Sequence, residues 1–118
     1  MLKLTPTPTE PAWMDLLPGV RLHLRPPSLH MILAARDAAA QIYRADLAAE
    51  TKDPGISTAA GIAMASSYAR ARILGWEGIG SEDGEELPAS SENIDQAMGV
   101  LAFHESFDRL VLAPALNG

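Results

Sequence analysis

Apolar and polar residues alternate near the start of the chain. Every second residue of Val20–Leu24 is apolar, which predicts a strand with one apolar face. Pro18-Gly19 stands just before it and is typical of a tight turn, because proline presets φ and glycine accepts a positive φ. We therefore expect a β-hairpin over residues 12–25, with Ala12–Leu16 as the partner strand and Gly19 as a structural turn residue.

A helical period begins after the hairpin. Ser28 is placed to cap a helix over residues 29–50. Arg36 falls within the apolar stripe of this helix, either as a side chain that snorkels at its edge or as an arginine that pairs with an acid on another chain. The positions that share this face at 100° per residue are Leu29, Ile32, Leu33, Ala40, Tyr43 and Leu47.

A second helix is predicted over residues 58–74. Its sequence is rich in alanine, glycine and serine, so another helix can approach it closely. Gly75 is expected to end this helix, because glycine is favoured just past a helix C-terminus. Trp76 follows this helix terminator and is expected to be a buried packing residue, because few other aromatic side chains are available to fill the core.

A third helix is predicted after a loop over residues 76–89. Ser90 or Ser91 caps it, and a bend is expected near residues 99–102. Pro114 should end it, because proline cannot continue a helix.

These elements together predict the fold class. We expect a mostly α protein with a small N-terminal β-hairpin followed by three to four packed helices, or an α+β protein if the hairpin is counted. Residues 1–11 alternate threonine and proline and should form a flexible arm. Residues 12–118 should form a single helical domain, which suits a chain of this length.

Composition and charge narrow the possible partners. The net charge is −6, and all the excess negative charge lies in residues 51–118, which hold ten acidic and four basic side chains. Such a surface repels nucleic acid, and it either favours a basic or neutral protein partner or serves solubility. No signal peptide or membrane-spanning stretch is visible. The absence of cysteine fits a reducing cytoplasm.

No pattern in the chain indicates catalysis or a cofactor. The three histidines lack the spacing of a metal pair on one helix, and the pair His104 and Asp108 has no nucleophile beside it in the sequence. The acidic residues around Gly84 fail the calcium-loop spacing, because Ile79 and Ser90 stand where carboxylates are required. We therefore predict no catalytic residue, no metal ligand and no cofactor.

The order of parts resembles the tail assembly chaperones of long-tailed phages, prophages and gene transfer agents. The resemblance lies in the Trp13–Arg21 hairpin, the alanine-rich helix, the Gly75–Ile79 segment, the acidic loop, the Ser90–Ile94 helix start and the last helix with Phe107. It implies a non-enzymatic protein that coats the tape-measure protein and helps recruit tail-tube protein in the host cytoplasm. A head–tail connector or minor tail structural protein is the first alternative, and a small hydrolase or metal-binding domain is the second.

Self-association is also expected, because alanine-rich apolar helix faces suit a homo-oligomer that coats a helical client. The candidate protein-binding residues are Leu29, Leu33, Arg36 and Tyr43 on the first helix, with Phe103 and Phe107 on the last. Nucleic acid and membrane are not expected as partners.

Overall fold

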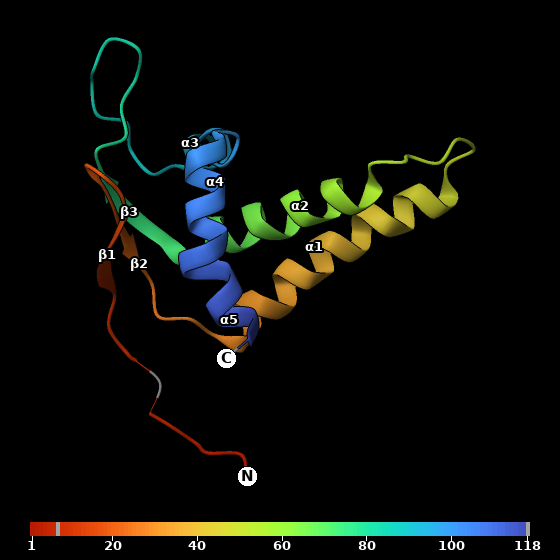
Figure 1. Ribbon diagram of the computed structural model, residues 1–118, viewed down its shortest axis with the longest axis horizontal. Coiled ribbons are helices and arrows are strands. Elements are labelled where there is room, and N and C mark those ends of the chain that lie inside the picture. Colours follow the sequence, from red (N-terminus) through yellow and green to blue (C-terminus); the bar gives the residue numbers. More distant parts are fainter. Residues whose placement is uncertain (7, 118) are drawn as a thin grey trace.

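A three-stranded antiparallel sheet and a set of helices make up the fold, which is about half helical and belongs to the α+β class. The computed structural model describes residues 1–6 and 8–117 (Figure 1). In chain order the elements are β1 (Ala12–Leu17), β2 (Val20–Leu24), α1 (Leu29–Ala48), α2 (Ile56–Arg72), β3 (Ile73–Glu77), α3 (Ser91–Met98), α4 (Leu101–Phe107), the π-helical segment η1 (Asp108–Leu112) and α5 (Ala113–Asn117). The predicted mostly helical chain with an N-terminal hairpin is confirmed.

The N-terminal hairpin forms where the alternating pattern predicts it. β1 pairs antiparallel with β2, with Met14 opposite Leu22. Gly19 closes the turn with φ of 79°, a conformation that glycine adopts without a steric penalty. Leu22 and Leu24 are buried beneath the sheet, while the polar residues of the same strand line the opposite face.

The outer face of the sheet carries a set of stacked and charged side chains. Trp13 and His23 stack with their ring centroids 4.6 Å apart, and the Arg21 guanidinium lies 5.0 Å from the Trp13 ring centroid. Arg21 also contacts the carboxylates of Asp15 at 3.3 Å and Glu77 at 3.5 Å. Because these groups are largely exposed, the ion pairs contribute little to stability.

The third strand was not predicted, and the expectation that Gly75 ends the second helix is wrong. α2 ends at Arg72 and continues directly into β3, which pairs with β2 so that Gly75 lies opposite His23 and Trp76 opposite Leu22. The expected loop over residues 76–89 therefore begins only after Glu77. Gly75 lies beside His23 on the outer face of the sheet and, having no side chain, leaves space there. A Cβ added at Gly75 would lie 3.9 Å from the His23 Cβ.

Two arginines join the end of β2 to the junction between α2 and β3. Arg25 donates to the carbonyls of Ala71 at 3.2 Å and Ile73 at 3.1 Å. Arg72 donates back to the carbonyl of Arg25 at 2.7 Å and to the hydroxyl of Tyr68 at 2.8 Å. These bonds satisfy carbonyls that the helix end leaves without partners and fix the angle at which α2 meets the sheet.

The core lies between the inner face of the sheet, α2, the second half of α3, and the rod formed by α4, η1 and α5. Leu22, Tyr68 and Phe107 are completely buried in it. Trp76 is half-buried; its indole N–H donates to the Leu87 carbonyl at 2.7 Å and its ring meets Phe103 edge-on, with centroids 6.2 Å apart. The indole thereby ties the segment before α3 to the sheet.

The predicted bend in the last helical region is present, but the prediction that Pro114 ends it is wrong. α3 stops at Met98, and α4 starts afresh at Leu101 after a short turn through Gly99. From there α4, η1 and α5 follow one another without interruption, and Pro114 lies inside α5. Pro114 lies in the first turn of α5, directly after the π-helical segment. Proline destabilises a helix least in its first turn, because the N–H that proline lacks is not needed there.

α1 and α2 form a helical hairpin that projects from the rest of the molecule (Figure 1). The molecule is consequently flat and extended, with principal extents of 50 × 44 × 19 Å. Ser28 caps α1 as predicted, since its hydroxyl accepts from the Met31 N–H at 3.3 Å. At the far end, Lys52 donates to the carbonyls of Asp46, Leu47 and Ala49 at 2.8–2.9 Å, which caps the helix C-terminus with a positive charge.

Candidate protein-binding surfaces

α1 carries two apolar faces, and α2 covers only one of them. The buried or half-buried side chains of α1 are Met31, Ile32, Ala35, Ala38, Ala39, Ala40, Ile42 and Asp46, and all of them except Ala40 lie on the face toward α2 and the core. The second face, here called the α1 stripe, consists of Leu29, Leu33, Arg36, Ala40, Tyr43 and Leu47. At 100° per residue the two faces are centred about 120° apart, so the helix presents a second complete seam.

The α1 stripe remains largely exposed. Leu29 is 68% exposed, Leu33 51%, Tyr43 44% and Leu47 75%. Successive positions along the stripe are separated alternately by four and three residues, the spacing of the core positions in a coiled coil. An exposed seam of this length is unusual for a monomer and marks a surface that another helix can cover.

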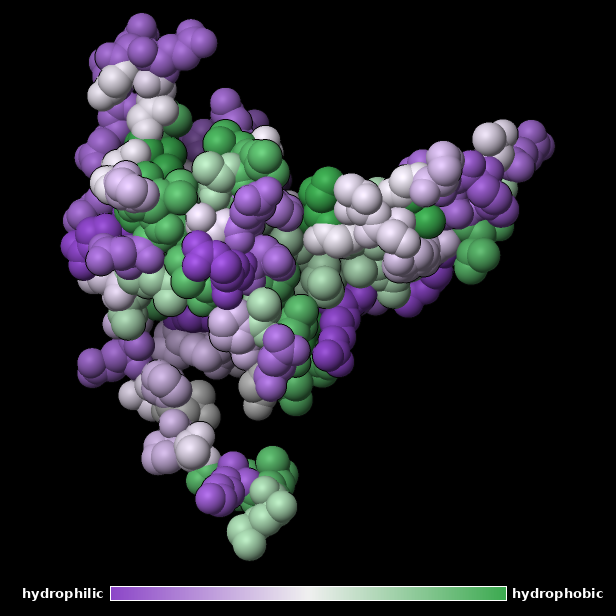
Figure 2. Space-filling model, viewed as in Figure 1, coloured by the Kyte–Doolittle hydropathy of each residue, from purple (hydrophilic) through white to green (hydrophobic). Residues whose placement is uncertain are grey.

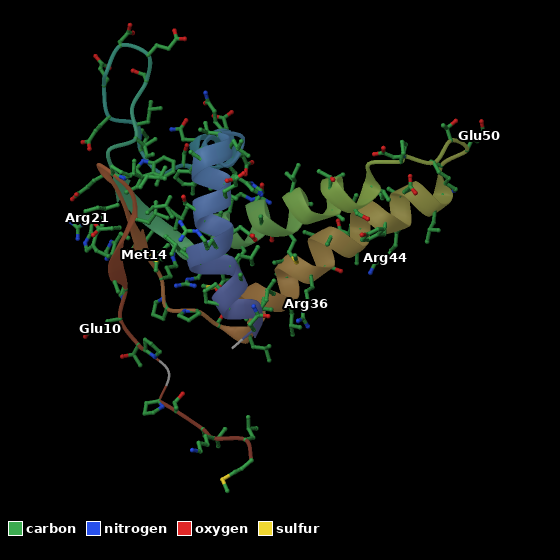
Figure 3. The ribbon with its side chains drawn as sticks, in the orientation of Figure 1. Glu10, Met14, Arg21, Arg36, Arg44 and Glu50 are labelled. Carbon is green, nitrogen blue, oxygen red and sulfur yellow. The ribbon has the colours of Figure 1, made fainter. Side chains whose placement is uncertain are left out.

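The charges on this side of α1 are few and local. Figure 3 shows Arg36 and Arg44 on the side of α1 that points away from α2. Arg44 lies 3.7 Å from Asp37, whose carboxylate also accepts from Gln41 at 2.8 Å. Arg36 makes no salt bridge with any residue in the described part of the chain. The stripe therefore holds one cation whose guanidinium is available to a partner.

Two of the candidate binding residues do not lie at the surface. Phe103 and Phe107 face the core, where they are 3% and 0% exposed. Phe107 meets Tyr68 at a centroid distance of 6.4 Å. The expectation that these phenylalanines form a face for a partner is therefore wrong, because the sheet and α2 already cover them. Leu29, Leu33, Arg36 and Tyr43 lie together on one exposed face, and their role in binding a partner stays a prediction.

The structure adds a groove that the sequence did not indicate. Thr58, Ile62 and Ser66 of α2 form one wall, and the other wall is made by the α3–α4 turn and the first turn of α4. Ile62 and Leu101 at its edges are exposed, so apolar surface extends beyond α1 (Figure 2). Helical spacing groups Ile62 with the buried Ala65 and Ala69, which is why its exposure could not be predicted.

A second hollow, of about 330 Å³, lies below the hairpin turn. Its lining is mainly apolar and includes Val20, Ile79, Leu87 and Phe103. The acidic loop forms one side of it: the Gly80–Glu86 bridge closes a turn in which Gly84 adopts φ of 82°. The carboxylates of that turn are exposed to solvent, in keeping with a solvated acidic turn.

The titratable side chains do not assemble into a site of obvious chemistry. His23 stacks on Trp13, and a ring nitrogen of His104 lies 3.1 Å from the Met98 carbonyl. Within residues 1–6 and 8–117, no group of three or more histidine or carboxylate side chains could hold a metal ion. Across the same described residues, no helix has both the length and the apolarity needed to cross a membrane.

Comparison with known proteins adds no further identification. No protein-family model, no curated protein and no solved structure matches this chain.

Proposed function

We propose that this protein is a non-enzymatic assembly chaperone that binds amphipathic helices of a tape-measure protein and assists tail-tube assembly in a long-tailed phage, prophage or gene transfer agent. The observation that carries the proposal is the α1 stripe, a coiled-coil seam exposed on a projecting helical hairpin. A helix of the client would lie along α1 as a third helix beside α2 and bury its own apolar face against the stripe. The resemblance of the sequence to tail assembly chaperones supports the same function.

The size of the stripe sets the strength of one contact. Full burial of a large apolar side chain contributes about 1.5–3 kcal/mol, and the four large apolar side chains of the stripe are already partly covered. Burying each of these side chains would therefore contribute about 1 kcal/mol to binding, and the side chains of the client would contribute a similar amount. The free-energy cost of association, about 4 kcal/mol or more, opposes these contributions. One copy would therefore bind weakly, and stable coating requires many copies along one long client.

The charge distribution favours apolar over electrostatic binding. Six carboxylates and no basic side chain occupy residues 77–92, whereas the stripe itself carries only Arg36. Salt screens exposed charges but not apolar contact. We therefore expect client binding to weaken only modestly as the salt concentration rises.

Co-expression with the tape-measure protein encoded nearby tests the proposal. The wild-type chain should keep that protein soluble and copurify with it. Leu33→Glu should abolish copurification, because it places a charge in the middle of the seam at a position exposed enough to leave the fold intact. Leu74→Glu is the matched control, since this leucine of β3 is 41% exposed but lies outside both the stripe and the groove.

A different outcome of the co-expression experiment would exclude the proposed function. If the tape-measure protein stays insoluble with the wild-type chain, and a panel of tail-tube proteins also fails to bind, the chaperone function is excluded. A head–tail connector or minor tail structural protein would then be the better interpretation. Such a protein would remain in purified particles, where mass spectrometry would detect it.

A further inference from the structure

The spacing and the charge of the α1 stripe identify a second partner for it. We propose that two copies of this chain pair through their α1 helices, antiparallel across a twofold axis, in the absence of a client. This inference concerns the isolated protein and does not require the chaperone function. Its observations are the alternating four- and three-residue spacing of the stripe, its exposure, and the position of Arg36 within it.

The stripe is complementary to itself in one antiparallel register. When the axis passes level with residue 38, Leu29 lies opposite the second copy's Leu47, and Leu33 lies opposite its Tyr43. Arg36 lies opposite Ala40, so that the longest side chain of the stripe meets the smallest. All six positions are then paired, and each layer joins the two alternating core positions of the heptad, as an antiparallel coiled coil requires.

The position of Arg36 favours an antiparallel pair of α1 helices over a parallel one. A parallel pair in register would place two Arg36 side chains in the same layer, where like charges repel. The antiparallel register moves them about 6 Å apart along the axis, at a rise of about 1.5 Å per residue. It also brings Asp37 of both copies near the twofold axis, where its carboxylate, which contacts Arg44 at 3.7 Å, partly offsets the charge of Arg36.

The pair is expected to be weak and reversible. The stripe spans about 27 Å of helix and a helix is about 10 Å wide, so the contact is well below the roughly 800 Å² per partner of a standard stable interface. A weak pair protects the apolar seam at high concentration and yields when another helix competes for it. The competition with a tape-measure helix rests on the proposed function, whereas the pairing itself does not.

Introduced cysteines test the direction and register of the pair, because the chain has no cysteine of its own. Leu29→Cys and Leu47→Cys are prepared as separate proteins and oxidised alone or as an equimolar mixture. In an antiparallel pair of Leu29→Cys chains, the two introduced thiols would be about 27 Å apart, far beyond the reach of a disulfide. We therefore expect a covalent dimer in the mixture, through position 29 of one copy and position 47 of the other, and at least a tenfold lower yield from either variant alone.

Each other outcome overturns the inference. Efficient crosslinking of Leu29→Cys alone would show a parallel pair, and no crosslinking in the mixture would show that the stripe does not pair with itself. Adding Leu33→Glu to both proteins should abolish the mixed dimer, whereas adding Leu74→Glu, on β3 and outside the stripe, should leave its yield unchanged. An equal loss with both glutamates would show nonspecific association. Because no client is present, a negative result here leaves the co-expression test independent.

Discussion

Gly78→Ala is expected to destabilise the protein by about 2–5 kcal/mol. Gly78 adopts φ of 86°, and a Cβ added there would lie 1.8 Å from the Gly19 carbonyl oxygen and 2.9 Å from its carbon. Positive φ costs a residue with a side chain about 1–2 kcal/mol, and forcing an atom into packed structure costs a further 1–3 kcal/mol or so. Both obstructing atoms belong to the backbone of the β1–β2 turn, so no side chain can move aside.

Gly84→Ala provides the matched control. Gly84 adopts nearly the same φ, 82°, but an added Cβ would meet nothing within 4 Å. It should lose only the conformational contribution of about 1–2 kcal/mol. Urea denaturation of the two variants and the wild-type chain measures the difference. Equal losses would show that the segment after β3 does not pack against the hairpin turn as described.

Phe107→Ala should cost a similar amount, about 3–5 kcal/mol, which is the range for removing a buried aromatic ring. The Phe107 ring has no exposed surface and packs against Tyr68, so its loss leaves a cavity between the sheet, α2 and the helical rod. Thermal and urea denaturation measure the loss in the free energy of unfolding.

Leu33→Ala is the comparison for that variant. Leu33 is about half exposed on α1, so its truncation should change the free energy of unfolding by less than about 1 kcal/mol. The two variants thus separate a core residue from a surface residue of comparable apolar character. A small effect at Phe107 together with a large effect at Leu33 would contradict the assignment of the core.

The elements with local signals could be predicted from the sequence, and the non-local ones could not. The hairpin has both strands and its turn within fourteen residues, and the Ser28 and Ser90 caps each act within one helical turn. β3 depends on pairing with β2, about fifty residues earlier in the chain. Its sequence contains a glycine and follows a helix without a break, so only the tertiary pairing makes it a strand.

The candidate binding face was likewise only partly predictable. Helical spacing groups Leu29, Leu33 and Tyr43 on one face of α1, but spacing alone does not tell which face a neighbouring helix covers. In the structure α2 covers the face of α1 that contains Ala35, and Leu29, Leu33 and Tyr43 stay exposed. For the last helix the outcome is reversed, because Trp76 of the unpredicted strand β3 packs against Phe103 and Tyr68 of α2 packs against Phe107.

The most direct test of the proposed function is the number of copies bound to each tape-measure chain. Native mass spectrometry of the copurified complex measures this number for the full-length tape-measure protein and for a version with half of its helical region removed. The account predicts many copies on the full-length protein and about half as many on the shortened one, since weak contacts repeated along a rod depend on its length. A single copy, or a number that does not change with length, would contradict the proposal that this protein coats its client.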